Sequence, residues 1–260
     1  MTEPDGGLLD QGLEAVLFDL DGVVTDTAAV HAKAWKRLFD TYLAEREGRE
    51  TPSEPFRVPE DYTAFVDGMP RYEGVRSFLR SRGIDLPWGH VDDPPDEETV
   101  CGLGNAKNIY FNQVIDEEGV EVFDSTITLI EALRAAGVKT ACVSSSKNCR
   151  PVLERTGLLD HFDVVFDGLD LERENLPGKP EPDAFLRSAE RLGTTPATTA
   201  LVEDAVSGVQ AGRAGRFKQV IGLDRGAGHD VLLASGADVV VDDLAVFLPE
   251  TRAASTPAAG

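Results

Sequence analysis

Two aspartates stand two residues apart in the stretch AVLFDLDGVVTDT, residues 15–27. The apolar run 15–18 has the length and composition of a buried parallel strand, and Asp19 and Asp21 follow it directly. Carboxylates at this spacing point the same way along an extended chain and repel each other. The pair is costly unless a cation or a proton lies between the two groups. The alternative interpretation is a strand that ends in an acidic turn.

Further polar groups follow other apolar runs of the sequence. SSSKN, at residues 144–148, comes after one run, and Glu203 and Asp204 come after a later one. Lys179 stands between them in the loop segment GKPEPD. Because the carboxyl ends of parallel strands meet at one edge of a sheet, we expect these groups to lie together with the first two aspartates.

This set of side chains suits phosphoryl transfer. Oxygen ligands from several aspartates, without histidine or cysteine, favour a hard cation such as Mg²⁺. One carboxylate can attack phosphorus and form an aspartyl-phosphate, while the other donates a proton to the leaving oxygen. Ser144 and the backbone N–H groups after it would hold the transferring oxygens. Lys179 would neutralise the charge that builds on the phosphoryl group.

The elements that must position these groups alternate along the chain. Six short apolar runs predict strands, at residues 15–18, 138–143, 164–166, 199–202, 219–223 and 237–241. Helical patterns lie between most of them, at residues 126–136, 183–192 and 205–214, each followed by a glycine. Such alternation is typical of an α/β fold with a parallel sheet and helices on both faces.

The long stretch between the first two of these strands interrupts the alternation. It begins with an amphipathic helix whose apolar stripe is Val30, Ala34, Trp35, Leu38, Phe39 and Tyr42. A second apolar pattern precedes Gly83, and a third helix is expected over residues 105–115. Residues 85–98 are rich in proline and acidic side chains, which predicts an exposed loop. We therefore expect a helical cap at residues 25–123, a catalytic core at 13–24 and 124–248, and disordered tails at 1–12 and 249–260.

The composition argues against several classes of partner. The chain has 260 residues and a net charge of −21, from 25 basic and 46 acidic side chains, whereas a nucleic-acid binder needs a basic surface. No stretch approaches the roughly 20 apolar residues of a membrane span, and the N-terminus has no signal pattern. Cys101, Cys142 and Cys149 lack the spacing of metal ligands. We expect a cytoplasmic monomer that binds neither nucleic acid nor membrane.

Four segments resemble, in order, the four signature motifs of the haloacid dehalogenase superfamily: FDLDGVVTDT, VSSSKN, GKPEPD and LVEDAVSGVQAG. The resemblance covers roughly residues 13–245. The details DGVVTDT and SSSKN, together with His31 and Trp35 on the first cap helix, are most similar to the β-phosphoglucomutase branch. This resemblance implies a Rossmann-like core, a helical cap and an Mg²⁺-dependent aspartyl nucleophile.

The resemblance also assigns roles in the core. Asp19 would be the nucleophile and Asp21 the acid–base, and the family's metal also takes the backbone carbonyl of this second aspartate. Asp204 would be a metal ligand with Glu203 beside it. Ser144 and Lys179 would bind phosphate.

In the same branch, an arginine of the cap and a Ser-Lys-Asn segment of the core grip the second phosphate of a sugar bisphosphate. The candidates here are Arg71, in DGMPRYEGV, and the loop residues Ser145, Ser146, Lys147 and Asn148. The alternative for Arg71 is a solvated surface arginine. The resembled cap segment has a lysine where this chain has Asp67, a difference that bears on which hexose fits.

His31 and Trp35 complete the expected substrate-binding set. His31 could contact the acid–base residue when the cap closes, and the alternative is a histidine on a helix surface. The segment GLGNAK, residues 102–107, lacks the third glycine and the preceding strand of a dinucleotide fingerprint, so we do not expect a nucleotide site there.

Two enzymatic functions and one binding function are compatible with these residues. A phosphomutase would move phosphate between the C1 and C6 oxygens of a β-hexose phosphate through a bisphosphate. A sugar-phosphate phosphatase would use the same core and let water attack the aspartyl-phosphate. Arg71 and Lys147 favour the mutase, because a bisphosphate needs two anion sites. A non-catalytic phosphosugar-binding module is disfavoured because binding alone does not require a nucleophile.

Overall fold

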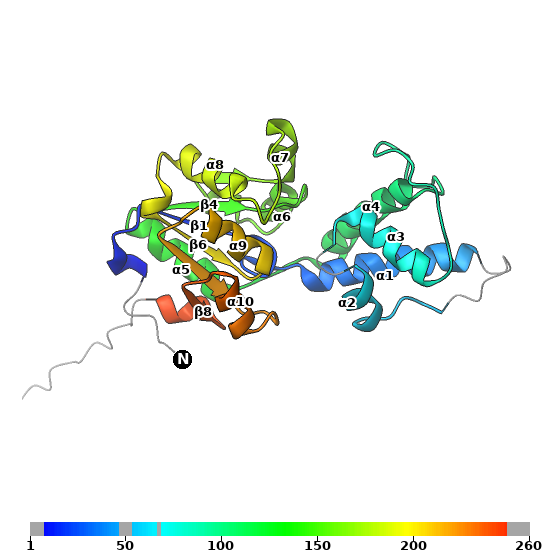
Figure 1. The fold of residues 1–260 in the computed structure, drawn as a ribbon, viewed down its shortest axis with the longest axis horizontal. Coiled ribbons are helices and arrows are strands. Elements are labelled where there is room, and N and C mark those ends of the chain that lie inside the picture. The colour runs from blue at the N-terminus through cyan, green and yellow to red at the C-terminus, as the bar shows by residue number, and fades with distance from the viewer. Residues whose placement is uncertain (1–7, 47–53, 67–68, 249–260) are drawn as a thin grey trace, which may run out of the picture. The chain divides into compact units, whose positions relative to one another are not determined.

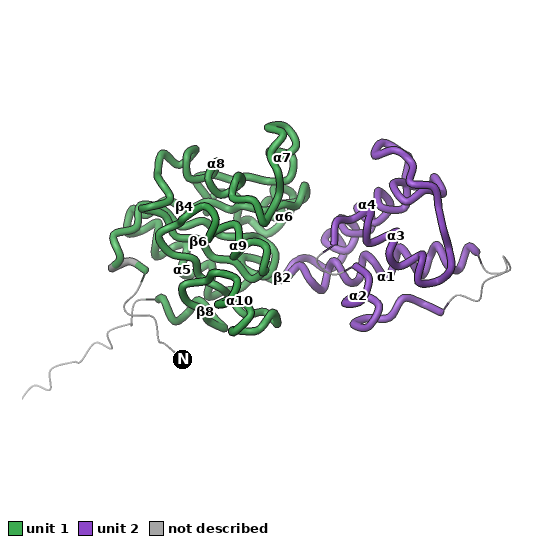
Figure 2. The backbone as a smooth tube through the Cα atoms, viewed as in Figure 1, with its two compact units in different colours: residues 1–26, 121–260 green, residues 27–120 purple. Residues whose placement is uncertain are grey.

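The structure, a computed structural model, describes residues 8–46, 54–66 and 69–248 (Figure 1). The chain divides into two units, residues 1–26 with 121–260 and residues 27–120 (Figure 2). We call the first the core unit and the second the helical unit.

Six parallel strands form the sheet of the core unit, in the order β5-β4-β1-β6-β7-β8 (Figure 1). Each apolar run predicted to be a strand is confirmed. The order reverses beside the central strand β1, so the carboxyl ends of β1 and β6 flank the topological switch point, where ligands bind in open α/β sheets. The strands are β1 (Ala15–Phe18), β4 (Lys139–Val143), β5 (Val164–Phe166), β6 (Thr199–Glu203), β7 (Gln219–Leu223) and β8 (Val239–Val241).

Helices cover both faces of this sheet, as the alternation of side chains along β1 requires. Ala15 and Leu17 share one buried core with side chains of α8, α9 and α10. Val16 and Phe18 point to the opposite face and are also fully buried. The predicted α/β fold is therefore confirmed. The helices are α5 (Asp124–Ala135), α6 (Cys149–Arg155), α7 (Gly168–Glu174), α8 (Asp183–Leu192), α9 (Val206–Ala214) and α10 (His229–Ser235).

The helical unit is built around the apolar stripe that the sequence predicts. All six residues of that stripe on α1 are buried. Phe39 of this helix packs against Phe56 and Phe78, with ring centroids 5.2 and 4.1 Å away. The helix expected at residues 105–115 lies inside a longer one, and residues 85–98 contain neither helix nor strand. The helices are α1 (Ala28–Glu45), α2 (Glu60–Phe65), α3 (Arg71–Ser81) and α4 (Val100–Glu118).

A pair of short antiparallel strands lies where the chain passes between the units. β2 (Thr25–Asp26) pairs with β3 (Glu121–Val122), and both belong to the core unit. The sequence does not predict these strands, because two-residue segments with acidic side chains carry no apolar period.

The prediction of a disordered tail over residues 1–12 is wrong for its last part. Leu8–Gln11 forms a 3-10 helix, and the side chain of Leu8 is fully buried. Lys218 also donates a hydrogen bond to the carbonyl of Gln11. Both contacts hold this turn against the core unit. Residues 1–7 and 249–260 lie outside the described part of the chain.

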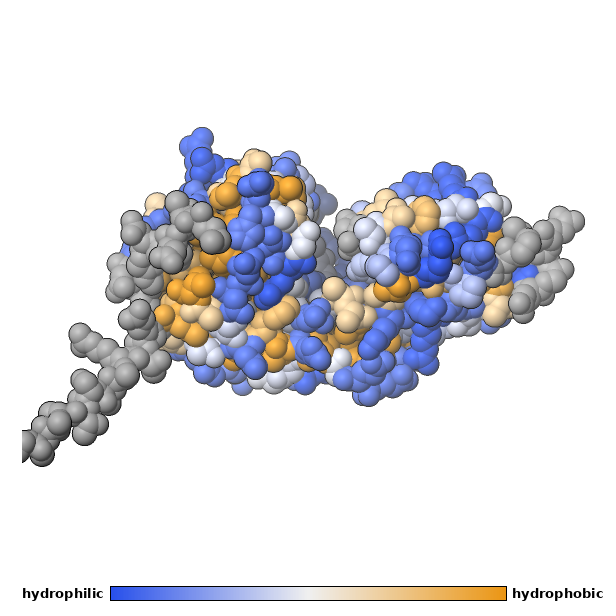
Figure 3. Space-filling model, turned by 90° about the horizontal axis from the view of Figure 1, so that it is seen from below, coloured by the Kyte–Doolittle hydropathy of each residue, from blue (hydrophilic) through white to orange (hydrophobic). Residues whose placement is uncertain are grey.

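The surface mixes hydrophilic side chains with smaller apolar areas on the face of each unit seen in Figure 3. Within the ranges that the structure describes, none of the helices combines the length and apolar character needed to cross a membrane.

Candidate active site

Asp19 lies at the switch point of the sheet, directly after β1. Its N–H donates to the carbonyl of Val202 over 3.1 Å, which fixes it beside the end of β6. Its side chain is buried, with only 6% of the residue exposed. The Nζ of Lys179 donates to Asp19 Oδ1 over 2.5 Å and also to Glu203 Oε1. One buried ammonium group therefore bridges carboxylates from two neighbouring strands.

This bridge keeps Lys179 charged. Its side chain is 10% exposed, and burial by itself would lower its pKa. The charges of Asp19 and Glu203 outweigh that burial and raise the pKa of Lys179 above its ordinary value. A permanently charged group at this place can balance negative charge on a phosphoryl group next to Asp19.

Three carboxylates converge at the same point. Oxygen atoms of Asp19, Glu203 and Asp204 all lie within 4.8 Å of one another. Glu203 is completely buried, and its second oxygen accepts a hydrogen bond from the N–H of Ala205 over 3.1 Å. Asp204 rests against Gly22, where a Cβ would lie 2.0 Å from the Oδ2 of the aspartate. Only glycine leaves room for the carboxylate there.

The cluster carries more negative charge than its single lysine balances. Burial raises the pKa of Glu203 to about 7, against the opposing attraction of Lys179. Burial, together with the charges of Glu203 and Asp19, raises the pKa of Asp204 to about 8. The one lysine therefore does not offset the burial and mutual repulsion of these carboxylates, and a divalent cation would supply the further positive charge.

The donor set fits Mg²⁺. All donors of the cluster are carboxylate oxygens, which hard cations prefer, and neither histidine nor cysteine belongs to it. Three of the four predicted metal residues, Asp19, Glu203 and Asp204, come together here. The side chain of Asp21 lies outside this triangle, so any part it has in metal binding would come through its backbone carbonyl, as the family resemblance implies.

The predicted phosphate-binding loop follows β4. Ser144 is buried and its Oγ accepts a hydrogen bond from the N–H of Ser146 over 3.0 Å. The carbonyl of Ser146 accepts from the N–H of Gly168, the first residue of α7, over 3.1 Å. A Cβ on that glycine would lie 2.5 Å from the carbonyl oxygen of Ser145. The start of α7 thus holds the loop in place.

The charged end of this loop already has a partner. Lys147 Nζ lies 2.8 Å from Glu172 on α7, and both side chains are exposed. The N–H of Asn148 donates to Ser146 Oγ over 3.1 Å. A phosphate at Lys147 would therefore compete with a carboxylate.

Two cationic side chains of the helical unit, Lys107 and Arg71, lie near His31. His31 Nδ1 and Lys107 Nζ are 2.7 Å apart, and Lys107 is only 4% exposed. Arg71 donates to Asn108 Oδ1 over 3.1 Å. Burial, and then the charges of Lys107 and Arg71, hold the pKa of His31 well below its usual range, so a neutral imidazole accepts the lysine N–H. This local excess of positive charge suits an anion, within a chain whose net charge is −21.

Lys107 is a candidate that sequence reasoning missed. It stands in GLGNAK, a segment whose glycines draw attention only to a nucleotide motif. Its Nζ lies 5.2 Å from the ring centroid of Trp35 and 4.8 Å from that of Phe111. Trp35 is 4% exposed and stacks on Phe39, which places it in the core of the helical unit beneath the lysine. Asp67 lies outside the described residues.

Comparisons with known proteins give the family of the chain. Residues 13–216 match the family of haloacid dehalogenase-like hydrolases. The chain belongs to this family. It is 51% identical over 244 residues to a β-phosphoglucomutase of Mycobacterium bovis, covering 92% of this chain and 93% of the relative. A β-phosphoglucomutase of Bacillus subtilis is 31% identical over 233 residues, with 88% and 89% covered.

The fold of this chain also matches solved structures. A crystal structure of β-phosphoglucomutase from Clostridium difficile aligns with a TM-score of 0.66 and 26% identity, over 90% of this chain and 92% of the other. The matched range of the family contains the whole carboxylate cluster and Lys179. It ends before β7.

Proposed function

We propose that this protein is an Mg²⁺-dependent phosphomutase that interconverts a β-hexose 1-phosphate and a hexose 6-phosphate through a sugar bisphosphate. The observation that carries the proposal is the buried carboxylate of Asp19 at the switch point, bound by Lys179 over 2.5 Å and flanked by Glu203 and Asp204. The 51% identity to a β-phosphoglucomutase supports the choice of substrate.

In this proposal Asp19 is the nucleophile. Its carboxylate oxygen attacks phosphorus, the bond from phosphorus to the leaving oxygen breaks, and an aspartyl-phosphate forms. Asp21 donates a proton to the leaving oxygen and later removes a proton from the hydroxyl that accepts the phosphoryl group. Mg²⁺ at Asp19, Asp204 and the carbonyl of Asp21, with Glu203 beside it, would stabilise charge on the phosphoryl oxygens.

Other groups would orient and neutralise the substrate. Lys179 and Ser144 bind the transferring phosphoryl group, one by charge and the other by its hydroxyl. The loop at residues 145–148 would bind the second phosphate and the sugar, as would Lys107 and Arg71 with the neutral His31 beside them. A guanidinium suits this role because its planar fork can grip phosphate at two oxygens. Two separate anion sites are what a bisphosphate intermediate needs and a monophosphate phosphatase does not.

The test supplies β-glucose 1-phosphate with catalytic β-glucose 1,6-bisphosphate and Mg²⁺, and follows glucose 6-phosphate against inorganic phosphate. We expect glucose 6-phosphate to accumulate with little free phosphate, and activity to stop when EDTA removes the cation. Release of one inorganic phosphate for each sugar phosphate consumed would instead identify a phosphatase. A sample with Asp19→Asn controls for contaminating mutases.

A further inference from the structure

Three successive carbonyl groups in the loop after Asp21 are each held by a donor from elsewhere in the core unit. The carbonyls belong to residues 22–24. Arg225 Nε donates to the first over 3.0 Å, Thr126 Oγ1 to the second over 2.8 Å, and the N–H of Phe123 to the third over 3.1 Å. Phe123 is the residue before α5 and Thr126 lies in its first turn, whereas Arg225 belongs to the loop after β7.

The carbonyl that Arg225 holds belongs to the most constrained residue of the loop. Gly22 has φ +81°, and its α-carbon rests against the carboxylate of Asp204. Gly22 is bonded to Asp21 and packs against Asp204, so a change in its backbone angle ψ, which turns this carbonyl, would alter the turn next to both residues. The orientation of this one peptide therefore affects both the proposed acid–base and a proposed metal ligand.

Arg225 is itself fixed in two further ways. Its Nη1 donates to the carbonyl of Asp242 over 3.3 Å, and its guanidinium carbon lies 3.8 Å from the ring centroid of Phe123. The planar fork sets the angle between Nε and Nη1, so one orientation of the guanidinium meets both carbonyls. A lysine offers a single point charge and cannot bridge them in this way.

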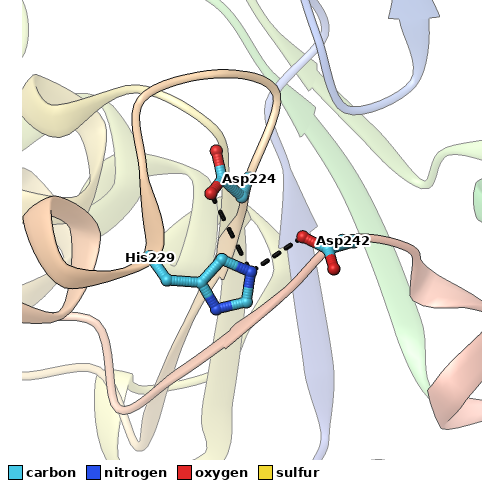
Figure 4. Close-up of side chains that lie close together, drawn as sticks. All are labelled: Asp224, His229 and Asp242. Atoms are coloured by element: carbon cyan, nitrogen blue, oxygen red, sulfur yellow. Dashed lines mark hydrogen bonds and ion pairs between the residues drawn. The ribbon is translucent and has the colours of Figure 1, made fainter. Parts of the chain in front are cut away.

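The loop that carries Arg225 is anchored on both sides (Figure 4). Asp224 Oδ1 accepts hydrogen bonds from the N–H groups of Gly226 and Gly228, over 2.8 and 3.0 Å. At the other end of the loop, His229 Nε2 is hydrogen-bonded to Asp242 Oδ1 over 2.7 Å and lies 3.8 Å from Asp224 Oδ2. The end of β7, the start of α10 and the end of β8 thus form one support for the arginine.

We propose that Arg225 is a positioning residue for phosphoryl transfer. By holding the carbonyl of Gly22, it sets the orientation in which Asp21 meets the leaving oxygen. This inference rests on the proposed function for the role of Asp21, but not on which sugar phosphate is the substrate.

The test compares two phosphate esters that differ in their need for an acid. The leaving group of 4-nitrophenyl phosphate, an activated aryl ester, departs as the phenolate without protonation. The alkoxide of a simple alkyl phosphate must be protonated as it leaves. The variants are Arg225→Ala and Arg225→Lys, and Asp21→Asn gives the reference pattern. The matched control is Arg213→Ala, which removes another exposed arginine of the core unit, whose guanidinium pairs with the carboxylate of Asp238.

We expect both Arg225 variants to lose about tenfold in kcat on the alkyl ester and about twofold or less on the aryl ester. Arg213→Ala should match the wild type on both. Urea unfolding of each variant shows whether it is folded under assay conditions, and Arg225→Lys keeps the charge if the alanine variant unfolds. Equal losses on the two esters would overturn the proposal, as would wild-type kinetics for Arg225→Lys.

The same assays separate this proposal from the choice of substrate. If the wild-type protein hydrolyses both esters but makes no glucose 6-phosphate, the mutase function is wrong. The ratio of kcat on the alkyl ester to kcat on the aryl ester still tests Arg225 in that case. If the protein is an active mutase and this kcat ratio is the same in the two Arg225 variants as in the wild type, only the positioning role of Arg225 is wrong.

Discussion

A few charges decide the chemistry at the scale of single residues. Lys179 is the ammonium that bridges Asp19 and Glu203, and Asp204 adds a third carboxylate within 4.8 Å. Burial, and after it the repulsion between the carboxylates, raises the pKa values of Glu203 and Asp204. A divalent cation would relieve this imbalance of charge, because added positive charge reduces repulsion among buried carboxylates.

Asp19→Asn tests the nucleophile. The amide keeps the shape of the side chain but cannot form an acyl-phosphate, so we expect turnover to fall by about four orders of magnitude or more with the fold retained. Mutase turnover and circular dichroism together check this. Asp160→Asn, an exposed aspartate of the same unit, is the control. Turnover near the wild-type rate would rule out an aspartyl-phosphate at this residue.

Arg71→Ala tests the second phosphate site. If the guanidinium grips the distal phosphate in a desolvated site, its loss should cost about 2–4 kcal/mol in kcat/KM for the bisphosphate. Hydrolysis of 4-nitrophenyl phosphate, which has no second phosphate, should change little. Arg80→Ala is the control, because that arginine lies on the same helix and pairs with Asp85. Unchanged use of the bisphosphate would remove Arg71 from the substrate site.

At the scale of the elements, close approach of backbone and side chain shapes the site. The loop after β1 turns at Gly22, whose φ of +81° and missing Cβ let Asp204 approach. The loop after β4 is held by Gly168 at the start of α7 in a similar way, through a contact that a Cβ would block. Because Gly22 and Gly168 have no Cβ, the carboxylate of Asp204 and the carbonyl of Ser145 can lie against them.

Gly22→Ala separates the cost of backbone strain from the loss of this contact. Gly137 has the same φ of +81°, and a methyl group on its α-carbon would meet nothing within 4 Å, so Gly137→Ala is its matched control. Both variants should lose about 1–2 kcal/mol of unfolding free energy through strain. Only Gly22→Ala should also lose Mg²⁺-dependent activity, because its methyl group displaces the Asp204 carboxylate. Equal activities in the two variants would contradict the close contact.

At the scale of the whole molecule, two histidines give the stability opposite dependences on pH. The pKa of His31 is lowered, first by burial and then by Lys107 and Arg71, so the folded state binds fewer protons than the unfolded one as the pH falls below about 6.5. The hydrogen bond to Asp242 raises the pKa of His229, so its contribution is present below the unfolded pKa and lost as the pH rises through the folded one.

Urea unfolding of the wild type, His31→Gln and His229→Gln at pH 7.5 and 5.5 checks these signs. Relative to His31→Gln, the wild type should become less stable on going to pH 5.5. Relative to His229→Gln, it should become more stable over the same interval. A shift of the same sign for both variants would show that one of the two environments is wrongly described.

The strands and the order of the motifs could be predicted from the sequence because their signals are local. The apolar runs at β1, β5 and β7 match the observed strands residue for residue. The convergence of Asp19, Glu203 and Asp204 also follows from the sequence, because parallel strands place their carboxyl ends at one edge. The turn at Leu8–Gln11, with its buried Leu8, could not be predicted, since it depends on a surface that distant segments create.

The sequence by itself therefore determined the α/β class, the family and the carboxylate centre, all of which follow from short-range patterns and strand polarity. Only the tertiary structure decided that Lys107 is buried against His31, and that Arg225 holds the carbonyl of Gly22. Lysine usually lies exposed, and no local pattern marks a buried one such as Lys107. Arg225 is exposed, and nothing in its local sequence marks the carbonyl that it holds. Their partners are 76 and 203 positions away along the chain, so these contacts exist only once the helices and strands have packed.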